Sequence, residues 1–205
     1  MPADALADLL AEIRACTLCR DTPQGSPLPH APRPVLRAST TARLAIAGQA
    51  PGTRVHRSGI PFTDPSGVRL RAWMGVTDAE FYDERRVAIL PMGFCFPGLD
   101  RHGGDRPPRR ECAPAWRFRL LAAMPQLELI LLVGSYAHRW HAPERRGTTV
   151  AAIVADFRAV LDADRRPRVM PLPHPSWRNN AWITANPWFE AETLPRLRTE
   201  VRKLI

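Results

Sequence analysis

The four cysteines of the chain stand in two pairs whose spacing suits metal binding. Two residues separate Cys16 from Cys19, and sixteen separate Cys95 from Cys112. Thiolates in such a pattern hold either zinc or an iron–sulfur cluster, and spacing alone leaves the two open. Structural disulfides are disfavoured because we expect a reducing compartment, and the CxxC pair disfavours scattered buried cysteines. The pattern therefore predicts a metal centre bound by all four cysteines.

Two other segments carry side chains suited to acid–base chemistry. Gly59–Gly67 form a rigid loop with one aromatic ring, Phe62, and one carboxylate, Asp64. A phenyl ring in a cleft stacks on a nucleobase, and a carboxylate stabilises a cationic sugar or orients a water. His174, which precedes Pro175, has the chemistry of an acid, a base or an electrostatic stabiliser. Each residue also has an alternative without chemistry. Phe62 would be a ring in the core, Asp64 would cap the next helix, and His174 would be a histidine hydrogen-bonded in a turn.

A glycine-rich turn follows the first apolar run. Its sequence is Gly48-Gln49-Ala50-Pro51-Gly52, which predicts a tight turn with exposed backbone N–H groups. Such groups hold a water, an anion or a carbonyl oxygen. A plain turn between a strand and a loop is the alternative interpretation of this segment when it is taken alone.

Four short apolar runs predict the strands of a sheet. They are continuous rather than alternating, which is typical of strands buried on both faces. The predicted strands span Leu44–Gly48, Val87–Met92, Leu129–Gly134 and Val169–Pro173. Helices are predicted at residues 4–15, 66–75, 112–124, 149–162 and 187–204, the last with Asn186 as N-cap.

This alternation predicts an α/β fold, a three-layer α/β/α sandwich around a short, mostly parallel, four-stranded sheet. The length fits a single domain over residues 1–205. In such folds, ligands bind beyond the carboxyl ends of the strands. Segments 48–52, 92–98 and 174–179 follow three of the predicted strands, so we expect them to contribute to one site.

The chain carries a net charge of +9, and every basic residue except Lys203 is an arginine. An excess of positive charge is typical of proteins that bind polyanions, and the guanidinium fork suits phosphate. Nucleic acid is therefore the favoured partner, with a simply basic surface as the alternative. No stretch approaches about 18 consecutive apolar residues, and the N-terminal segment lacks the pattern of a signal peptide. We expect a monomer in the cytoplasm, associated with the nucleoid and without a membrane partner.

The order of these motifs resembles that of uracil-DNA glycosylases. Residues 48–52 read GQAPG, residues 59–62 read GIPF, a cysteine-bearing segment follows the second predicted strand, and residues 174–176 read HPS. The likeness runs from Cys16 to Asn179 and is greatest to the family 4 and family 5 enzymes. It implies a glycosylase that hydrolyses the N-glycosidic bond of uracil flipped out of DNA, in base-excision repair. It also implies a [4Fe–4S] cluster bound by Cys16, Cys19, Cys95 and Cys112, with zinc as the alternative.

The resemblance further implies the roles of single residues. Asp64 guides the water or stabilises the sugar, Gln49 helps to hold the water, and His174 stabilises the departing uracil. Phe62 stacks on the base. The other substrate contacts fall to Gly48, Ala50, Ser176 and Asn179, and the DNA contacts to Arg54, Trp177 and Arg178.

Three departures from the family pattern bear on catalysis and specificity. Position 50 is alanine, where some of these families carry a catalytic Asp or Asn, so Asp64 takes that role as in family 5. Gln49 stands where family 4 has glutamate, and an amide orients water but accepts no proton. The asparagine that reads the uracil edge in several families is not evident after the second strand. Asn179, Asn180 or backbone groups are left to read the base.

Three other functions stay open. A protein of this fold and cluster that had lost catalysis would bind DNA or sense redox state. Ala50 and the missing pocket asparagine favour this alternative, whereas Asp64 and His174 together disfavour it. The second is a glycosylase for another damaged base, such as hypoxanthine. The third would trap the abasic product on His102 in the Cys95–Cys112 loop, but no surrounding motif supports that role, and a solvated loop histidine is the plainer interpretation.

Overall fold

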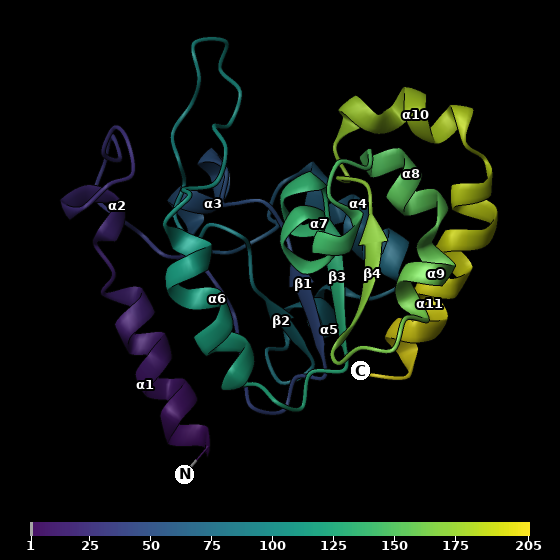
Figure 1. Cartoon of the computed structure of the whole chain (residues 1–205), viewed down its shortest axis with the longest axis horizontal. Coiled ribbons are helices and arrows are strands. Elements are labelled where there is room, and N and C mark those ends of the chain that lie inside the picture. The colour runs from purple at the N-terminus through teal and green to yellow at the C-terminus, as the bar shows by residue number, and fades with distance from the viewer. Residues whose placement is uncertain (1) are drawn as a thin grey trace.

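A parallel sheet of four strands forms the centre of the molecule, and helices cover both of its faces (Figure 1). The computed structural model describes residues 2–205, with side chains from Ala5 onward. The strands are β1 (Leu44–Ala47), β2 (Val87–Ile89), β3 (Leu129–Val133) and β4 (Arg168–Leu172). The helices are α1 (Pro2–Arg14), α2 (Leu18–Asp21), α3 (Thr53–Ser58), α4 (Pro65–Met74), α5 (Asp78–Tyr82), α6 (Cys112–Ala122), α7 (Ser135–His141), α8 (Val150–Ala155), α9 (Phe157–Leu161), α10 (Asn180–Ala185) and α11 (Leu194–Arg202). Short turns of 3-10 helix span Pro143–Arg145 and Trp177–Asn179, and a π turn spans Phe189–Thr193. Within residues 2–205, no helix has the length and apolar character that a membrane crossing requires.

The strand order is β2-β1-β3-β4, and every neighbouring pair is parallel. This confirms the predicted three-layer α/β/α fold around a four-stranded sheet. Strand β2 is shorter than predicted. The N–H groups of Leu90 and Met92 still donate to the carbonyls of Ile46 and Gly48, at 2.8 and 2.9 Å, so hydrogen bonds to the β1 side continue past the end of the strand.

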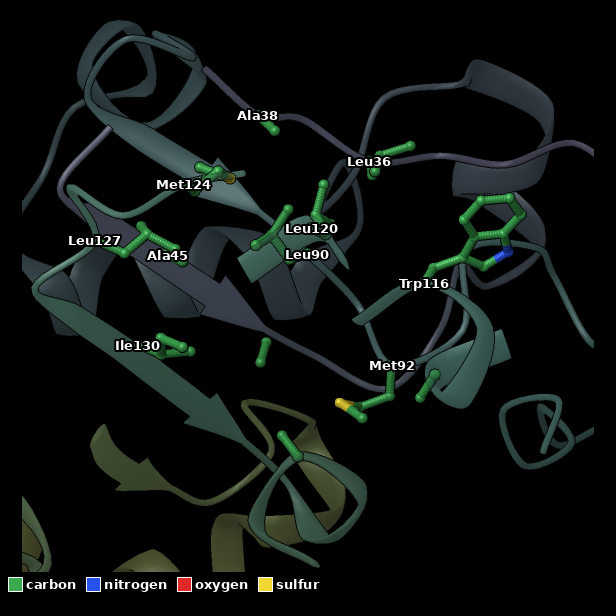
Figure 2. Packing of buried hydrophobic residues seen from close by; sticks show 14 of the residues in the cluster. Leu36, Ala38, Ala45, Leu90, Met92, Trp116, Leu120, Met124, Leu127 and Ile130 are labelled. Carbon is green, nitrogen blue, oxygen red and sulfur yellow. The ribbon is translucent and has the colours of Figure 1, made fainter. Parts of the chain in front are cut away.

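Alternate residues of the strands face opposite helical layers, which gives two apolar cores. On one face Ala45, Leu90 and Ile130 pack with side chains of α1 and α6 (Figure 2). On the other face Ile46 and Leu131 pack with side chains of α4, α5 and α11. Helices α8 and α9 contribute to both cores. Because both faces are covered, the strands read as continuous apolar runs in the sequence.

The N-terminal helix α1 packs on the outer side of α6 (Figure 1). Its apolar face is buried, at Leu6, Leu9, Leu10 and Ile13. From α1 the chain passes through the short α2 and a largely irregular segment before it enters β1. The packing of α1 on α6 brings the first and last cysteines, Cys16 and Cys112, to one side of the molecule.

The predicted helix at 149–162 is two helices in the structure. Helices α8 and α9 meet at Asp156, which ends the first and precedes the second. The Asp156 carboxylate pairs with the guanidinium of Arg145 at 2.7 Å, which ties this junction to the turn after α7. The apolar residues on both sides of the junction, Val154 and Phe157, still belong to one core.

The prediction that Asn186 caps the last helix is wrong. Asn186 instead follows α10, where its Nδ2 donates to the Trp182 carbonyl at 2.7 Å. The last helix begins with a π turn, which runs directly into α11. Pro195 accounts for the wide turn, because it has no N–H to donate to the carbonyl of Ala191 four residues earlier.

Candidate active site

A cleft of about 550 Å³ opens at the edge of the sheet where the strands end. Its walls come from the loops after β1 and β4, the start of α4 and the segment between β2 and α6. The side chains and turns that line it include Gly48, Gln49, Ala50, Arg54, Phe62, Asp64, Arg69, Leu99, Asp105, His174, Ser176, Trp177 and Arg178. The structure therefore brings the predicted segments 48–52 and 174–179 together at the carboxyl ends of the strands, whereas no residue of the predicted segment 92–98 lines the cleft.

The turn after β1 is held by backbone hydrogen bonds that prolong the sheet beyond its strands. The N–H of Met92 donates to the Gly48 carbonyl, and the N–H of Gly93 donates to the Gln49 carbonyl, both at 2.9 Å. A Cβ on Gly93 would lie 3.5 Å from that of Ala50, so the two segments pack closely. The turn is thereby fixed as one wall of the cleft.

Phe62 has a left-handed backbone conformation, with φ of 58°. Its carbonyl accepts hydrogen bonds from Arg71 Nη1 at 3.2 Å and from the Tyr82 hydroxyl at 3.1 Å, which hold the residue there. Position 67 requires glycine, since a Cβ on Gly67 would lie 1.8 Å from the Phe62 carbonyl oxygen. The Phe62 ring reaches Gly48, where a Cβ would lie 3.4 Å from Cζ. A non-glycine residue held at positive φ by its neighbours is a recurrent feature of functional sites.

Asp64 both caps α4 and lines the cleft. Its Oδ1 accepts a hydrogen bond from the Gly67 N–H at 3.3 Å, and Pro65 takes the first helical position. The helix-cap interpretation is thus correct, and it does not exclude a role of the same carboxylate in acid–base chemistry. The charge of Asp64 acts on both His174 and Asp105 across the cleft.

His174 follows the end of β4 and lies at the cleft wall against Gly134, the residue after β3. Burial lowers the pKa of His174 below its usual value. The Asp64 carboxylate partly offsets this, and the Arg178 guanidinium adds to it. The imidazole is therefore neutral at pH 7, with a proton on one ring nitrogen to donate.

The segment after His174 is braced from within and from α4. Asn179 Nδ2 donates to the His174 carbonyl at 2.6 Å. Arg69 reaches from α4 and donates from Nη1 to the Ser176 carbonyl at 3.2 Å and to Asn180 Oδ1 at 2.7 Å. These bonds fix the direction in which the segment leaves the sheet.

Trp177 and Arg178 form the exposed end of this segment. The Trp177 side chain is 72% exposed, and the Arg178 guanidinium lies 5.7 Å from the centroid of its ring. Arg54, on α3, is another exposed arginine at the cleft. An indole and two guanidinium groups at the cleft mouth are suited to stacking on bases and pairing with phosphates.

Of the catalytic, substrate-binding and DNA-binding residues predicted from the sequence, Asn179 does not line the cleft, and neither does its alternative, Asn180. The Asn179 amide is engaged by the carbonyl of His174. The charged cleft residues that were not predicted are Asp105 and Arg69. The Gly103-Gly104 pair before Asp105 is a turn signal, but nothing local places that turn at the cleft.

The four cysteines come from distant parts of the chain and line one small cavity. Cys16 follows α1, Cys19 lies in α2, Cys95 follows β2, and Cys112 begins α6. All four are free thiols. The rest of the cavity wall is mostly apolar and includes Ile13, Leu18, Phe94 and Trp116.

The cysteine thiols are in surroundings that disfavour isolated thiolates. Burial raises the pKa of Cys19 to about 11 and those of Cys95 and Cys112 to about 12. The backbone N–H of Phe94 donates to Cys112 Sγ at 3.3 Å. Four thiolates in one apolar cavity require positive charge among them, which a bound metal group supplies. In the positions that their side chains have in this structure, residues 5–205 include no group of three His, Cys, Asp or Glu that could hold a metal ion.

Two comparisons with known proteins found similarities to this chain. The crystal structure of wild-type SMUG2 from Pedobacter heparinus aligns with 95% of this chain and 97% of that chain, at 14% sequence identity and a TM-score of 0.46. A sequence model described as the Uracil DNA glycosylase superfamily matches residues 37–198, which include the turn after β1, the Phe62 loop and the segment after β4. Because this match spans most of the chain, the protein belongs to the uracil DNA glycosylase superfamily.

Proposed function

We propose that the protein is a DNA glycosylase that removes uracil from DNA by hydrolysis, of the kind found among the family 4 and family 5 enzymes. The observation that carries the proposal is the single cleft that holds Phe62, Asp64 and His174 beside the exposed Trp177 and Arg178. Membership of the superfamily supports the class of reaction, which is the release of a base from DNA. The geometry of the cleft supports the division of roles among its residues.

The target base has to leave the stack before it can enter such a cleft. Trp177 is the exposed side chain placed to fill the space that the base leaves, and Arg178 beside it is placed to pair with the backbone phosphates. Inside the cleft, the Phe62 ring offers a flat apolar surface on which the uracil stacks. The fixed conformation of Phe62 means that this surface is formed before the base arrives.

Cleavage of the glycosidic bond leaves positive character on the sugar and negative charge on the base. The Asp64 carboxylate, held by its cap bond to Gly67, stabilises the first charge. The neutral imidazole of His174 donates a hydrogen bond to the uracil oxygen on which the second charge develops. Gln49 holds the attacking water through its amide. Groups positioned in advance stabilise the transition state without reorganisation at the moment of reaction.

Both asparagines that follow β4 are engaged in structural hydrogen bonds. Asn179 donates to the His174 carbonyl, and Asn180 accepts from Arg69. We therefore assign recognition of the uracil edge to backbone groups of the cleft. A site without a dedicated side-chain amide discriminates less sharply between bases. Hypoxanthine is accordingly the second candidate substrate.

We also propose that Cys16, Cys19, Cys95 and Cys112 hold a [4Fe–4S] cluster, with zinc as the alternative. The support is the shared apolar cavity and the N–H donor to Cys112, since hydrogen bonds to sulfur tune such sites. When bound, the cluster would supply no reaction step, because its cavity shares no lining residue with the cleft. The role of the four cysteines is to tie α1 and α2 to α6.

Oligonucleotides that carry single damaged bases test the proposed activity. After incubation with the protein and alkaline cleavage, we expect strand scission at uracil and weaker scission at hypoxanthine. The same strand with cytosine at that position should stay intact. A protein that binds the uracil strand and never cuts it would contradict the proposal and favour the non-catalytic DNA-binding or redox-sensing alternative.

The affinity for DNA is expected to fall steeply with salt. Each phosphate neutralised by an arginine contributes about −0.9 to the slope of log affinity against log salt concentration on duplex DNA. Replacing Arg178 with alanine should therefore weaken binding and reduce the slope by about 1. Fluorescence anisotropy with a labelled duplex over a series of salt concentrations measures both quantities.

Arg43 provides the matched control for Arg178. It is exposed, it precedes β1 at the opposite edge of the sheet, and it pairs with Glu128 at 2.6 Å. Arg43→Ala makes the same change in charge and should leave the slope unchanged. Equal effects of the two substitutions, or a wild-type affinity that barely changes with salt, would mean that the cleft mouth does not contact phosphates.

A further inference from the structure

A second carboxylate, that of Asp105, lies at the cleft and has no role in the function described above. This carboxylate belongs to the segment that connects β2 to α6 in the chain. Figure 1 shows the segment in teal, as a narrow loop that projects beyond the start of α6. The loop is a pinned hairpin. Leu99 pairs with Asp105 in an antiparallel bridge, and Asp100 Oδ1 accepts from the N–H groups of His102 at 2.8 Å and Gly104 at 2.9 Å. Asp105 is therefore held on an ordered element.

Asp105 reaches the turn after β1 at Gly52. A Cβ on Gly52 would lie 3.0 Å from Asp105 Oδ2, so the absence of a side chain there makes room for the carboxylate. This turn is the wall that the proposed function assigns to the attacking water. A carboxylate oxygen beside it is placed to share that water with Gln49.

The surroundings of this carboxylate suit a proton acceptor. Among the described residues, no hydrogen bond stabilises its ionised form, whereas one oxygen of Asp64 is bonded to Gly67. Partial burial raises the pKa of Asp105 above its usual value, and the Asp64 charge adds to this while Arg178 opposes it. Asp105 remains exposed at the cleft mouth in the free protein, and DNA seated there would remove further water from it. A carboxylate whose pKa is raised is a stronger base.

We propose that Asp105 is a second catalytic carboxylate, which accepts a proton from the attacking water. This assignment rests on the proposed glycosylase function. It divides the activation of the water and the stabilisation of the sugar between two carboxylates. As the bond between C1′ of the sugar and N1 of uracil breaks, the electron pair leaves with the base. The water oxygen bonds to C1′, one of its protons passes to Asp105, and Asp64 stabilises the positive character of the sugar. The uracil anion then takes a proton from solvent, to which Asp105 releases its own.

Two carboxylates with different surroundings commonly take different roles in bond hydrolysis. Asp64 is fixed by its cap bond to Gly67 and serves to stabilise the sugar. Asp105 has free oxygens and stands on the side of the water-holding turn. Their separate origins, the start of α4 and the hairpin before α6, place them on different walls of one cleft.

The substitution Asp105→Asn tests the assignment, because it keeps the shape of the side chain and removes its basicity. In single-turnover assays at saturating enzyme, uracil release should slow by about 10²–10⁴-fold, the usual contribution of a general base. The wild-type rate should fall as the pH drops through the raised pKa of Asp105, and the variant should lose this dependence. The melting temperature and the affinity for DNA should stay near the wild-type values.

His102→Ala is the matched control, since His102 lies exposed on the same hairpin and does not line the cleft. It should release uracil at the wild-type rate. An active wild type with an equally active Asp105→Asn, or with an unchanged pH profile, would show that the assignment is wrong while the function stands. A wild-type protein that releases no uracil would overturn the function and the assignment together.

Discussion

Replacing His174 with alanine is expected to slow the release of uracil by about 10²–10³-fold in single-turnover assays. The neutral imidazole meets the negative charge that develops on the base, and no other histidine is among the residues that line the cleft. Because burial lowers the pKa of His174, the wild-type rate should show no inflection near pH 6.5. Binding to uracil-containing DNA should weaken much less, because phosphate contacts dominate the affinity.

His174→Asn is the matched comparison for this substitution. An asparagine amide keeps an N–H donor on a side chain of intermediate length, so it should recover part of the rate that alanine loses. The Gly134 backbone beside the ring leaves room for either replacement. Release of uracil by His174→Ala at the wild-type rate would mean that another group stabilises the departing base.

Asp64 acts with His174 in the proposed mechanism. Two substitutions of Asp64 separate its catalytic charge from its role as a helix cap. Asp64→Asn and Asp64→Ala both remove the charge, and each should slow uracil release by about 10²–10³-fold. Only alanine removes the acceptor for the Gly67 N–H, which should cost about 1 kcal/mol of stability. If Asp64→Asn cuts at nearly the wild-type rate, Asp64 is a helix cap alone. A water held by Gln49 and activated by Asp105 would then be the better account.

The sheet was predictable because its signal is local. Strands β3 and β4 are apolar on both faces, so their continuous runs marked them within one residue of their observed ends. The last helix was less predictable because the effect of Pro195 depends on whether the helix continues through it. The sequence alone did not show that the chain accepts a π turn there.

The candidate site was predictable as far as the order of motifs defines it. Gly48 and His174 follow the ends of β1 and β4, and strand ends of a parallel sheet meet at one edge. Phe62 lies on the loop between α3 and α4, and only the order of motifs placed it at this site. The contribution of Asp105 was not predictable, because it depends on a contact with Gly52 across more than fifty residues. For Asn179 the motif gave the position, but the hydrogen bond to its own turn decides where the amide points.

The largest effect on stability is expected from loss of the proposed cluster. Protein purified without oxygen should be brown and contain iron and sulfide in equal amounts. Cys112→Ser should remove the iron, because the thiolate that begins α6 is one of four ligands and has no substitute in the cavity. Loss of a metal centre is among the few changes that cost more than about 4 kcal/mol. For a chain of this size, that lowers the melting temperature by roughly 8–16 °C.

The substitution Thr17→Ala is the control for Cys112→Ser, since Thr17 lies between Cys16 and Cys19 and its side chain does not cap α2. This variant should keep its iron and its melting temperature. Because the cysteine cavity and the cleft share no lining residue, Cys112→Ser should act on the stability of the fold before it acts on the chemical step. Stoichiometric zinc without sulfide in the wild-type protein would make the cluster assignment wrong. The four thiols would then form a zinc site that performs the same task, which is to fasten α1 and α2 to α6.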